Sequence, residues 1–476
     1  MAPAIHRARR ALSATLFLLL PLVLVAPSLA AEQPPLPESI RDAIERAGDN
    51  RDEIVAAWNQ VPRDQSAGME FLIKYMPERD LTSLTTEYLL ENVDYAYRAW
   101  RSAPWHEQVS EELFLNEVLP YASINERRDQ WRKDFYDRFH PLVAEAKTPG
   151  EAAALLNQHV FNQVKVHYST KRPKADQSPY ESIDAGMASC TGLSILLIDA
   201  CRAVGVPARF VGIPMWTDGS GNHSWVEVWD DGWHFTGADE ATGLDLDKAW
   251  FVDRAAQARA DEPRHSIYAV SYRHTPTRFP LVWRRAGDYV RAVNVTERYL
   301  KQGSAVPADH FAVMFRVLQG KSGDRCAANF RIRNSAGDVV FQGQTKDERF
   351  DANDHLTVPL PKDETFQVEI VDGDDVHVTQ IKADHADQLV TLETSNAAAA
   401  LREDAAGESP TDTLQQLAAY LAQPRASRGP IAEQAFASKP LSASDAAAAQ
   451  TQLWNDHVRF IEQQRRAEFD NNEIKL

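Results

Sequence analysis

The spacing of apolar residues divides the chain into regions of different character. From Glu32 to about Ala122, apolar residues recur every three to four positions and prolines interrupt them, which predicts a series of amphipathic helices. Beyond about Asp288, short runs rich in β-branched residues alternate with turn-forming residues, which predicts a β-sandwich of about 100 residues. The aromatic residues of the helical region have the spacing of a packed layer, which we favour over a substrate groove.

The segment between these regions predicts one helix followed by strands. Apolar residues at helical spacing predict a helix over roughly Thr191–Val204, and a strand follows over Val206–Met215. His223–Trp229 and Trp233–Thr236 are rich in β-branched and aromatic residues, and the Asp-Asp-Gly turn between them predicts a hairpin.

The hairpin register predicts which side chains face one another. If Trp229 pairs with Trp233, the same register places His223 opposite Asp239, with Cβ atoms about 4.5–5.5 Å apart. A slip of one residue would place Glu240 there instead. We therefore expect Asp239 to orient His223 and keep Glu240 as the reserve candidate.

Cys190 stands at the amino end of the predicted helix. Free backbone N–H groups and the helix dipole favour an anion there, so we expect the pKa of this thiol to be lowered and the thiolate to be available as a nucleophile. A small buried apolar cysteine is the commoner fate of this residue type, and we prefer that interpretation for Cys201 on the same helix. A cysteine nucleophile needs a base, and the base needs an orienting group, so Cys190, His223 and Asp239 are the predicted catalytic residues.

Several segments together resemble the transglutaminase-like superfamily of papain-like cysteine enzymes. They are Ser189–Gly192 opening a helix, Val204–Arg209 leading into a strand, His223–Val228, and Gly232-Trp233 followed by Asp239. The resemblance covers about residues 149–272 and departs from the family where Asp-Pro is often found, since this chain has Asp239-Glu240. It implies a bacterial-type exported member in which Cys190 is the nucleophile, His223 the general base and acid, and Asp239 the orienting residue. It also implies a papain-like α+β fold, with the cysteine helix packed on an antiparallel sheet that bears the other two residues.

The amino terminus predicts export. A basic stretch with Arg7, Arg9 and Arg10, an apolar stretch over Leu16–Val25, and the small-residue site Ser28-Leu29-Ala30 are typical of a secretory signal peptide. Pro21 interrupts the apolar stretch, so we expect no stable membrane insertion. The protein is therefore expected in the periplasm or the medium, and the sequence does not separate the two.

We expect an α+β protein made of five consecutive segments. They are a signal peptide (1–30), an N-terminal helical region (31–147), a transglutaminase-like catalytic domain (148–285), a β-sandwich (286–395), and a linker with C-terminal helices (396–476). The role of the sandwich and of the last helix, and the oligomeric state, are left open by the sequence.

The amino-acid composition limits which binding partners, metals and cofactors we expect for this chain. A formal net charge of −17 argues against nucleic acid or an anionic membrane as partner. An odd number of cysteines, three, in an exported chain implies one free thiol, which we assign to Cys190. The sequence does not decide whether Cys201 and Cys326 form a disulfide. Asp245 and Asp247 lack the glycine and ligand spacing of a calcium loop, so no obligatory metal and no cofactor are expected.

The predicted chemistry is acyl transfer through a thioester. Cys190 would attack an amide carbonyl of a peptide or protein, and water or an amine would then release the acyl group. Hydrolysis by a peptidase or amidase is slightly favoured over transamidation, because water is the default acceptor. Cell-wall peptides are one candidate class of substrate. They would also be the substrate if the chain were a cell-wall amidase of the broader papain-like group. The alternative is a non-catalytic scaffold that binds peptides or the cell wall.

Overall fold

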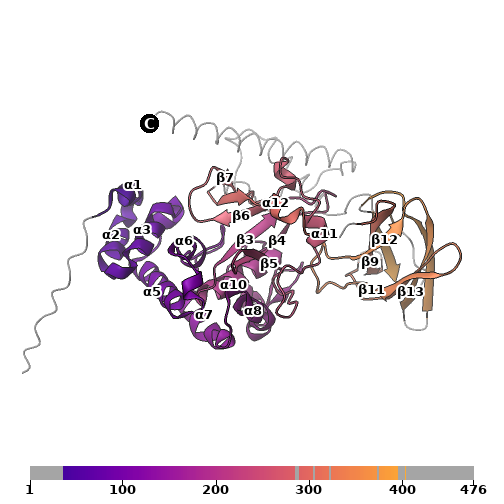
Figure 1. The fold of residues 1–476 in the computed structure, drawn as a ribbon, viewed down its shortest axis with the longest axis horizontal. Helices are drawn as coiled ribbons and strands as arrows, with labels where there is room; N and C mark the ends of the chain where they lie inside the picture. The colour runs from indigo at the N-terminus through magenta and orange to yellow at the C-terminus, as the bar shows by residue number, and fades with distance from the viewer. Residues whose placement is uncertain are drawn as a thin grey trace, which may run out of the picture. The chain divides into compact units, whose positions relative to one another are not determined.

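The computed structural model describes residues 36–284, 289–303, 306–320, 323–372, 375–386, 388–394 and 402–403. The expected signal peptide, most of the expected linker, and the expected C-terminal helices lie outside the described residues. Among the helices of the described ranges, none is long and apolar enough to span a bilayer. The described chain is mixed α+β, with helices first, a transglutaminase-like core next and strands last (Figure 1).

The N-terminal region is helical, as the apolar spacing predicts. Its α-helices are α1 (Glu38–Arg46), α2 (Arg51–Gln60), α3 (Ser66–Tyr75), α4 (Glu78–Leu81), α5 (Thr86–Ser102), α6 (Glu111–Leu113) and α7 (Arg132–Phe139). Short 3₁₀ segments η1 (Gly48–Asn50), η2 (Arg63–Gln65), η3 (His106–Gln108) and η5 (His140–Val143), and the π-helical η4 (Phe114–Val118), lie between or after them. Tyr97, Trp105 and Phe114 are buried in the same core as the central helix α10, so these aromatics pack rather than line a groove.

The central region places one buried helix on a six-stranded sheet. The sheet has the order β5-β4-β3-β6-β8-β7, and its strand pairs are antiparallel. The strands are β3 (Ala208–Ile213), β4 (His223–Trp229), β5 (Trp233–Thr236), β6 (Tyr268–Ser271), β7 (Thr277–Arg278) and β8 (Arg291–Asn294). Helix α10 (Cys190–Ala203) packs against β3 and β4 and is covered by α7 and α8 (Pro149–Val164) (Figure 1). The sheet continues past residue 285, where we expected the catalytic domain to end.

Smaller elements complete the central region. They are β1 (His167–Tyr168), which pairs in parallel with β2 (Met187–Ala188), α9 (Pro179–Ala185), α11 (Val252–Ala255), η6 (Pro263–His265) and α12 (Thr296–Tyr299). Helix α9 begins at a capping box in which Ser178 and Glu181 exchange hydrogen bonds, and Gly186 ends it with a φ of 65°. Gly186 thus allows the chain to turn sharply into β2, directly before Cys190.

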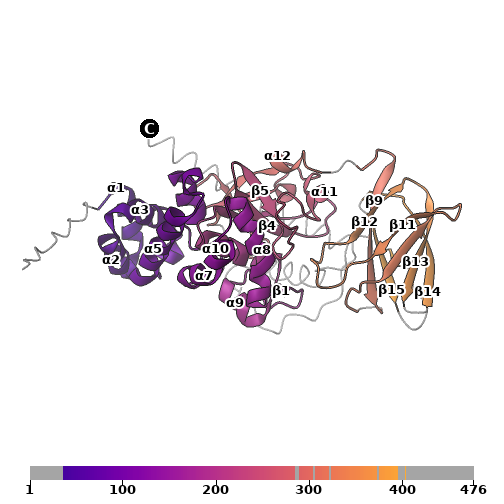
Figure 2. The same ribbon diagram turned by 60° about the horizontal axis from the view of Figure 1, so that its bottom comes forward.

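The C-terminal strands form two four-stranded sheets around one core. Their strands are β9 (His310–Gln319), β10 (Asn329–Arg333), β11 (Val339–Gln344), β12 (Leu356–Pro361), β13 (Thr365–Asp372), β14 (Asp375–Lys382), β15 (Leu389–Thr394) and β16 (Arg402–Glu403). The sheet orders are β11-β10-β13-β14 and β12-β9-β15-β16. Strands β9 and β11 to β15 are labelled in Figure 2. Phe315 of one sheet and Phe330 of the other have ring centroids 4.8 Å apart. The predicted sandwich is therefore confirmed, although β9 and β15 pair in parallel.

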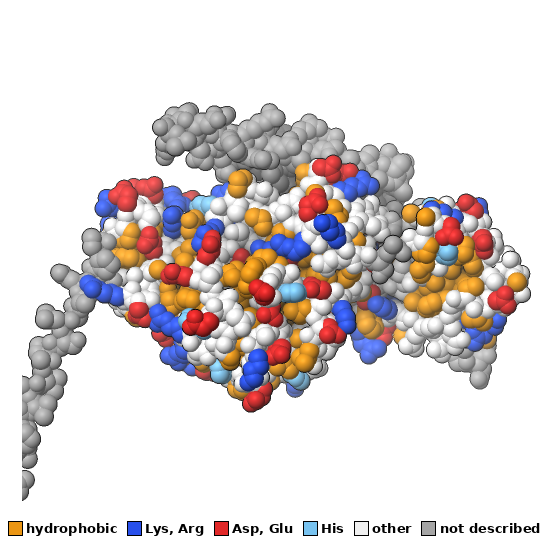
Figure 3. Space-filling view, viewed as in Figure 1, with side chains coloured by type: hydrophobic (Ala, Val, Ile, Leu, Met, Phe, Trp, Pro, Cys, Tyr) orange, Lys and Arg blue, Asp and Glu red, His pale blue; other side chains and the backbone are white. Residues whose placement is uncertain are grey.

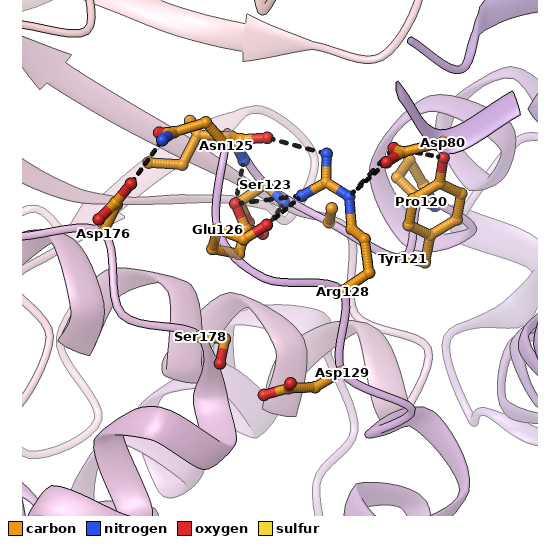
Figure 4. A network of polar contacts seen from close by, with 12 residues as sticks. Asp80, Pro120, Tyr121, Ser123, Asn125, Glu126, Arg128, Asp129, Asp176 and Ser178 are labelled. Atoms are coloured by element: carbon orange, nitrogen blue, oxygen red, sulfur yellow. Dashed lines mark hydrogen bonds and ion pairs between the residues drawn. The ribbon is translucent and has the colours of Figure 1, made fainter. Parts of the chain in front are cut away.

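A buried polar network links the helical region to the start of α10 (Figure 4). Arg128 donates to both carboxylate oxygens of Asp80, at 3.1 and 3.0 Å, and to the carbonyl of Glu126 at 2.8 Å. Asn125 in the same loop donates to Asp176. The neighbouring carbonyl of Ala175 accepts from the hydroxyl of Ser189, the N-cap of α10, at 2.8 Å. The network thus holds the segment that fixes the position of Cys190.

Candidate active site

Cys190 is the first residue of α10, as predicted. The Ser189 hydroxyl accepts from the backbone N–H of Gly192 at 3.3 Å, which caps the helix, and the backbone N–H of Ser224 donates to the thiol of Cys190. The hydroxyls of Thr191 and Ser224 are 3.2 Å apart and join the start of α10 to β4. These contacts fix the sulfur against the strand that carries His223.

The expected lowering of the Cys190 pKa is wrong. Burial raises the pKa of this thiol well above its ordinary value, and the nearby carboxylate of Asp351 raises it further, while the hydrogen bond from Ser224 opposes both effects. The helix amino terminus is present, but the loss of hydration outweighs it. The resting group is therefore a thiol, and a base must take its proton when it reacts.

His223 is the first residue of β4 and is enclosed by aromatic rings. Its ring centroid lies 4.9 Å from that of Trp250 and 5.0 Å from that of Phe251, and Trp216 and Trp225 stack at 6.0 and 5.9 Å. The residue is 2% exposed, and neither ring nitrogen has a hydrogen-bond partner of good geometry among the described residues. Packing against these rings therefore helps to fix the plane of the imidazole.

Asp351 lies beside His223 although it comes from the C-terminal sandwich. Its Oδ2 atom is 3.5 Å from His223 Nδ1, and ligand atoms of Cys190, His223 and Asp351 all lie within 4.8 Å of one another. Burial would raise the pKa of Asp351, but the charge of His223 and hydrogen bonds from Asn353 lower it to about 2. This carboxylate is thus ionised at neutral pH and forms a triad-like group with the cysteine and the histidine.

Contacts with the core hold the loop that carries Asp351. This loop, residues 345–355, connects β11 to β12. The backbone N–H of Ala352 donates to the hydroxyl of Tyr168 at 2.8 Å, and Asn353 Nδ2 donates to the carbonyl of Asn222 at 3.3 Å. Arg254 donates to the carbonyl of Asn353 at 3.1 Å. These contacts therefore hold the loop at the two residues that directly follow the carboxylate.

The predicted contact between Asp239 and His223 is absent from the structure. The register that suggested it is confirmed, since Trp229 pairs with Trp233 and Val226 with Thr236. However, β5 ends at Thr236, and the chain turns away through Asp239, whose φ is 65°. The Asp239 carboxylate lies 3.1 Å from His167 Nδ1 instead, and its backbone N–H donates to Asn157. A ladder three residues longer, from Thr236 to Asp239, was required to bring the carboxylate opposite His223.

Glu240, the reserve candidate, belongs to the wall of the site. Its Oε1 atom accepts from the indole N–H of Trp250 at 2.9 Å, and its Oε2 atom is buried without a partner among the described residues. Burial, reinforced by the charge of Asp351, raises the pKa of Glu240 to about 8. Because Trp250 packs on His223, Glu240 supports the ring that orients the histidine.

The remaining candidate groups have local partners. Asp247 Oδ2 lies 2.6 Å from His234 Nδ1, and Asp245 pairs with Lys248. Cys201 is buried in α10, and none of Cys190, Cys201 and Cys326, which are all described, takes part in a disulfide. The disulfide left open by the sequence is therefore not formed in this structure.

A family model matches the central region of the chain. Residues 137–239 match the family model described as the transglutaminase-like superfamily. No curated protein sequence matches the chain. Similar solved structures include a protein proposed to be a cysteine protease from Cytophaga hutchinsonii, at 17% identity and a TM-score of 0.21, covering 23% of this chain and 38% of that chain. Red sea bream transglutaminase matches at 10% identity and a TM-score of 0.21, covering 64% of this chain and 61% of that chain.

The chain thus spans less than two thirds of either of these solved structures. The matched segment contains Cys190 and His223, whereas Asp351 lies well beyond it. Sequence reasoning missed Asp351 because no periodic pattern marks a carboxylate in a loop of a second sheet region. Residues 137–239 of this chain form a domain of the transglutaminase-like superfamily.

Proposed function

We propose that this chain is an exported cysteine hydrolase that cleaves amide bonds of peptides or proteins. The observation that carries the proposal is the meeting of Cys190, at a helix amino terminus, with His223 and Asp351, whose ligand atoms lie within 4.8 Å of one another. A thiol, an imidazole and an ionised carboxylate in this arrangement have the properties of a nucleophile, a base and an orienting group. Export follows from the predicted signal peptide alone.

The proposed reaction starts from the protonated thiol. His223 takes the proton of Cys190 as the sulfur attacks the amide carbonyl carbon, and the Asp351 carboxylate stabilises the imidazolium that forms. The carbon–nitrogen bond then breaks, His223 returns the proton to the leaving amine, and a thioester remains on Cys190. Water adds to the thioester, and the carboxylic acid leaves as the thiol is restored.

The proposal also specifies which molecule accepts the acyl group from the thioester. We favour water, because it is present at high concentration and no described feature selects an amine. Transamidation would use the same thioester and differ only in the last step. Peptides of the cell wall are a suitable substrate class for an exported enzyme of this kind.

A peptide panel with three readouts tests the function. The mature chain would be incubated with glutamine-containing peptides and cell-wall peptides together with a labelled primary amine, and products would be resolved by mass. Cleaved or deamidated products that disappear in Cys190→Ala and His223→Ala support hydrolysis. Incorporation of the amine instead supports transamidation. If the peptides bind saturably but none of them is converted to product, the proposed enzymatic activity is overturned and the non-catalytic scaffold is favoured.

A further inference from the structure

We propose that Cys190, His223 and Asp351 bind one Zn²⁺ ion and that this ion reversibly blocks the nucleophile. Among the described residues, these three offer one sulfur, one nitrogen and one oxygen ligand atom within 4.8 Å of one another. The inference rests on the geometry of the donors and not on turnover, so it can be tested before any substrate is known.

The distances are close to those of a tetrahedral zinc site. Zinc bonds of about 2.0–2.3 Å to oxygen, nitrogen and sulfur place neighbouring donors about 3.3–3.8 Å apart. His223 Nδ1 and Asp351 Oδ2, at 3.5 Å, already have this separation. The Cys190 sulfur lies at most 4.8 Å from each of the other two donor atoms, so it has to approach them by no more than about 1 Å.

The lack of hydrogen-bond partners for the ring nitrogens of His223 is a second observation that favours a bound metal ion. The imidazole is 2% exposed, yet both of its nitrogens lack a hydrogen-bond partner of good geometry among the described residues. A buried polar atom without a partner costs about 1–3 kcal/mol, so native proteins seldom leave one. A metal bond to the nitrogen that faces Asp351 would satisfy it.

The types of donor atom, one sulfur, one nitrogen and one oxygen, indicate which metal ion the site would bind. Calcium and magnesium take oxygen ligands, whereas a thiolate, an imidazole and a carboxylate suit zinc. Three protein ligands leave a fourth position for water. In this state the sulfur electron pair that would attack a substrate is engaged in a metal bond.

Zinc would also join two parts of the chain. Cys190 and His223 lie on α10 and β4, while Asp351 lies on the loop between β11 and β12. The ion would add a metal link to the hydrogen bonds that Tyr168 and Arg254 already make with this loop. Zinc binding is therefore expected to raise the unfolding temperature as well as to block the thiol.

Metal titration of the full mature chain tests the proposal. Zn²⁺ would be added in competition with a chromophoric chelator, and Co²⁺ would be added separately to record thiolate-to-metal absorption in the near ultraviolet. We expect one ion per chain with a Kd below about 1 µM. Cys190→Ser, His223→Gln and Asp351→Asn should each weaken binding by at least about tenfold. Cys190→Ser should also abolish the cobalt–thiolate band.

Cys326→Ser is the matched control, because Cys326 is a cysteine that lies outside the group and forms no disulfide with the other two described cysteines. It should keep the wild-type affinity and the cobalt band. The proposal is overturned if wild type binds no zinc more tightly than about 100 µM, or if the cobalt band persists in Cys190→Ser and is lost in Cys326→Ser. Should Asp351→Asn fail to fold, the two cysteine variants still decide the outcome. Zinc binding by a chain that cleaves no peptide would leave this proposal standing while the proposed function fails.

Discussion

Oδ2 of Asp351 lies 3.5 Å from Nδ1 of His223, although the two residues come from different regions of the fold. His223 begins β4 of the central sheet, whereas Asp351 lies in the loop that connects β11 to β12 of the sandwich. The carboxylate is 4% exposed and the imidazole 2%, so a charge that forms on the imidazole interacts with the carboxylate with little screening by water. The sandwich is thereby connected to the chemistry of the site rather than serving only as a spacer.

The first prediction concerns the identity of the orienting carboxylate. Asp351→Asn should lower kcat/KM by about 10²–10⁴-fold, because the amide cannot stabilise an imidazolium. Asp239→Asn is the matched control and should change kcat/KM little, since Asp239 contacts His167. Both variants would be assayed across pH on any substrate found with the peptide panel. A large loss in Asp239→Asn alone would instead restore the role that the sequence assigned to Asp239.

The second prediction concerns the protonation of the nucleophile. Because burial raises the pKa of Cys190, its reaction with iodoacetamide should be slow at neutral pH and rise about tenfold per pH unit up to pH 9. Quantifying the labelled peptide by mass at each pH checks this expectation. A rate that is already constant between pH 6 and 8 would show a preformed thiolate and contradict it. Labelling in urea provides the control, since unfolding removes the burial.

Local structure around the site was predictable because short-range patterns determine it. The helix of Cys190 and the hairpin of His223 follow from apolar spacing and a turn, and the structure has both within a residue or two of the expected bounds. The sandwich expected from the short β-branched runs beyond about Asp288 is also present, with the strands β9 to β15. The pairing of His223 with Asp351 could not be predicted in this way, because it depends on how a loop of one sheet region meets another. Likewise, the pKa of Cys190 depends on burial that only the assembled structure reveals.

The third prediction concerns the buried network of Figure 4. Arg128→Met should lower the free energy of unfolding by about 3–5 kcal/mol, because it removes the buried cation 3.0 Å from the fully buried Asp80 and leaves the more distant and more exposed Arg79 beside that carboxylate. Arg98→Met is the control: Arg98 pairs with Asp94 at 3.3 Å, and both side chains are about half exposed. Its cost should stay below about 1 kcal/mol. Urea unfolding of both variants gives the comparison, and equal losses would show that the network contributes no more than a surface pair.

The fourth prediction concerns Glu240 and the pH dependence of stability. Its pKa is raised to about 8 from an ordinary value of 4.5 by burial and by Asp351. Between these pH values the folded chain keeps a proton that the unfolded chain has released, so stability falls as pH rises and the loss is complete above pH 8. Glu240→Gln cannot ionise and keeps an oxygen for the indole of Trp250. Relative to wild type, this variant should therefore gain about 3–5 kcal/mol between pH 5 and pH 9 in urea unfolding. A difference that stays constant across this range would mean that Glu240 titrates normally and is hydrated in the folded protein.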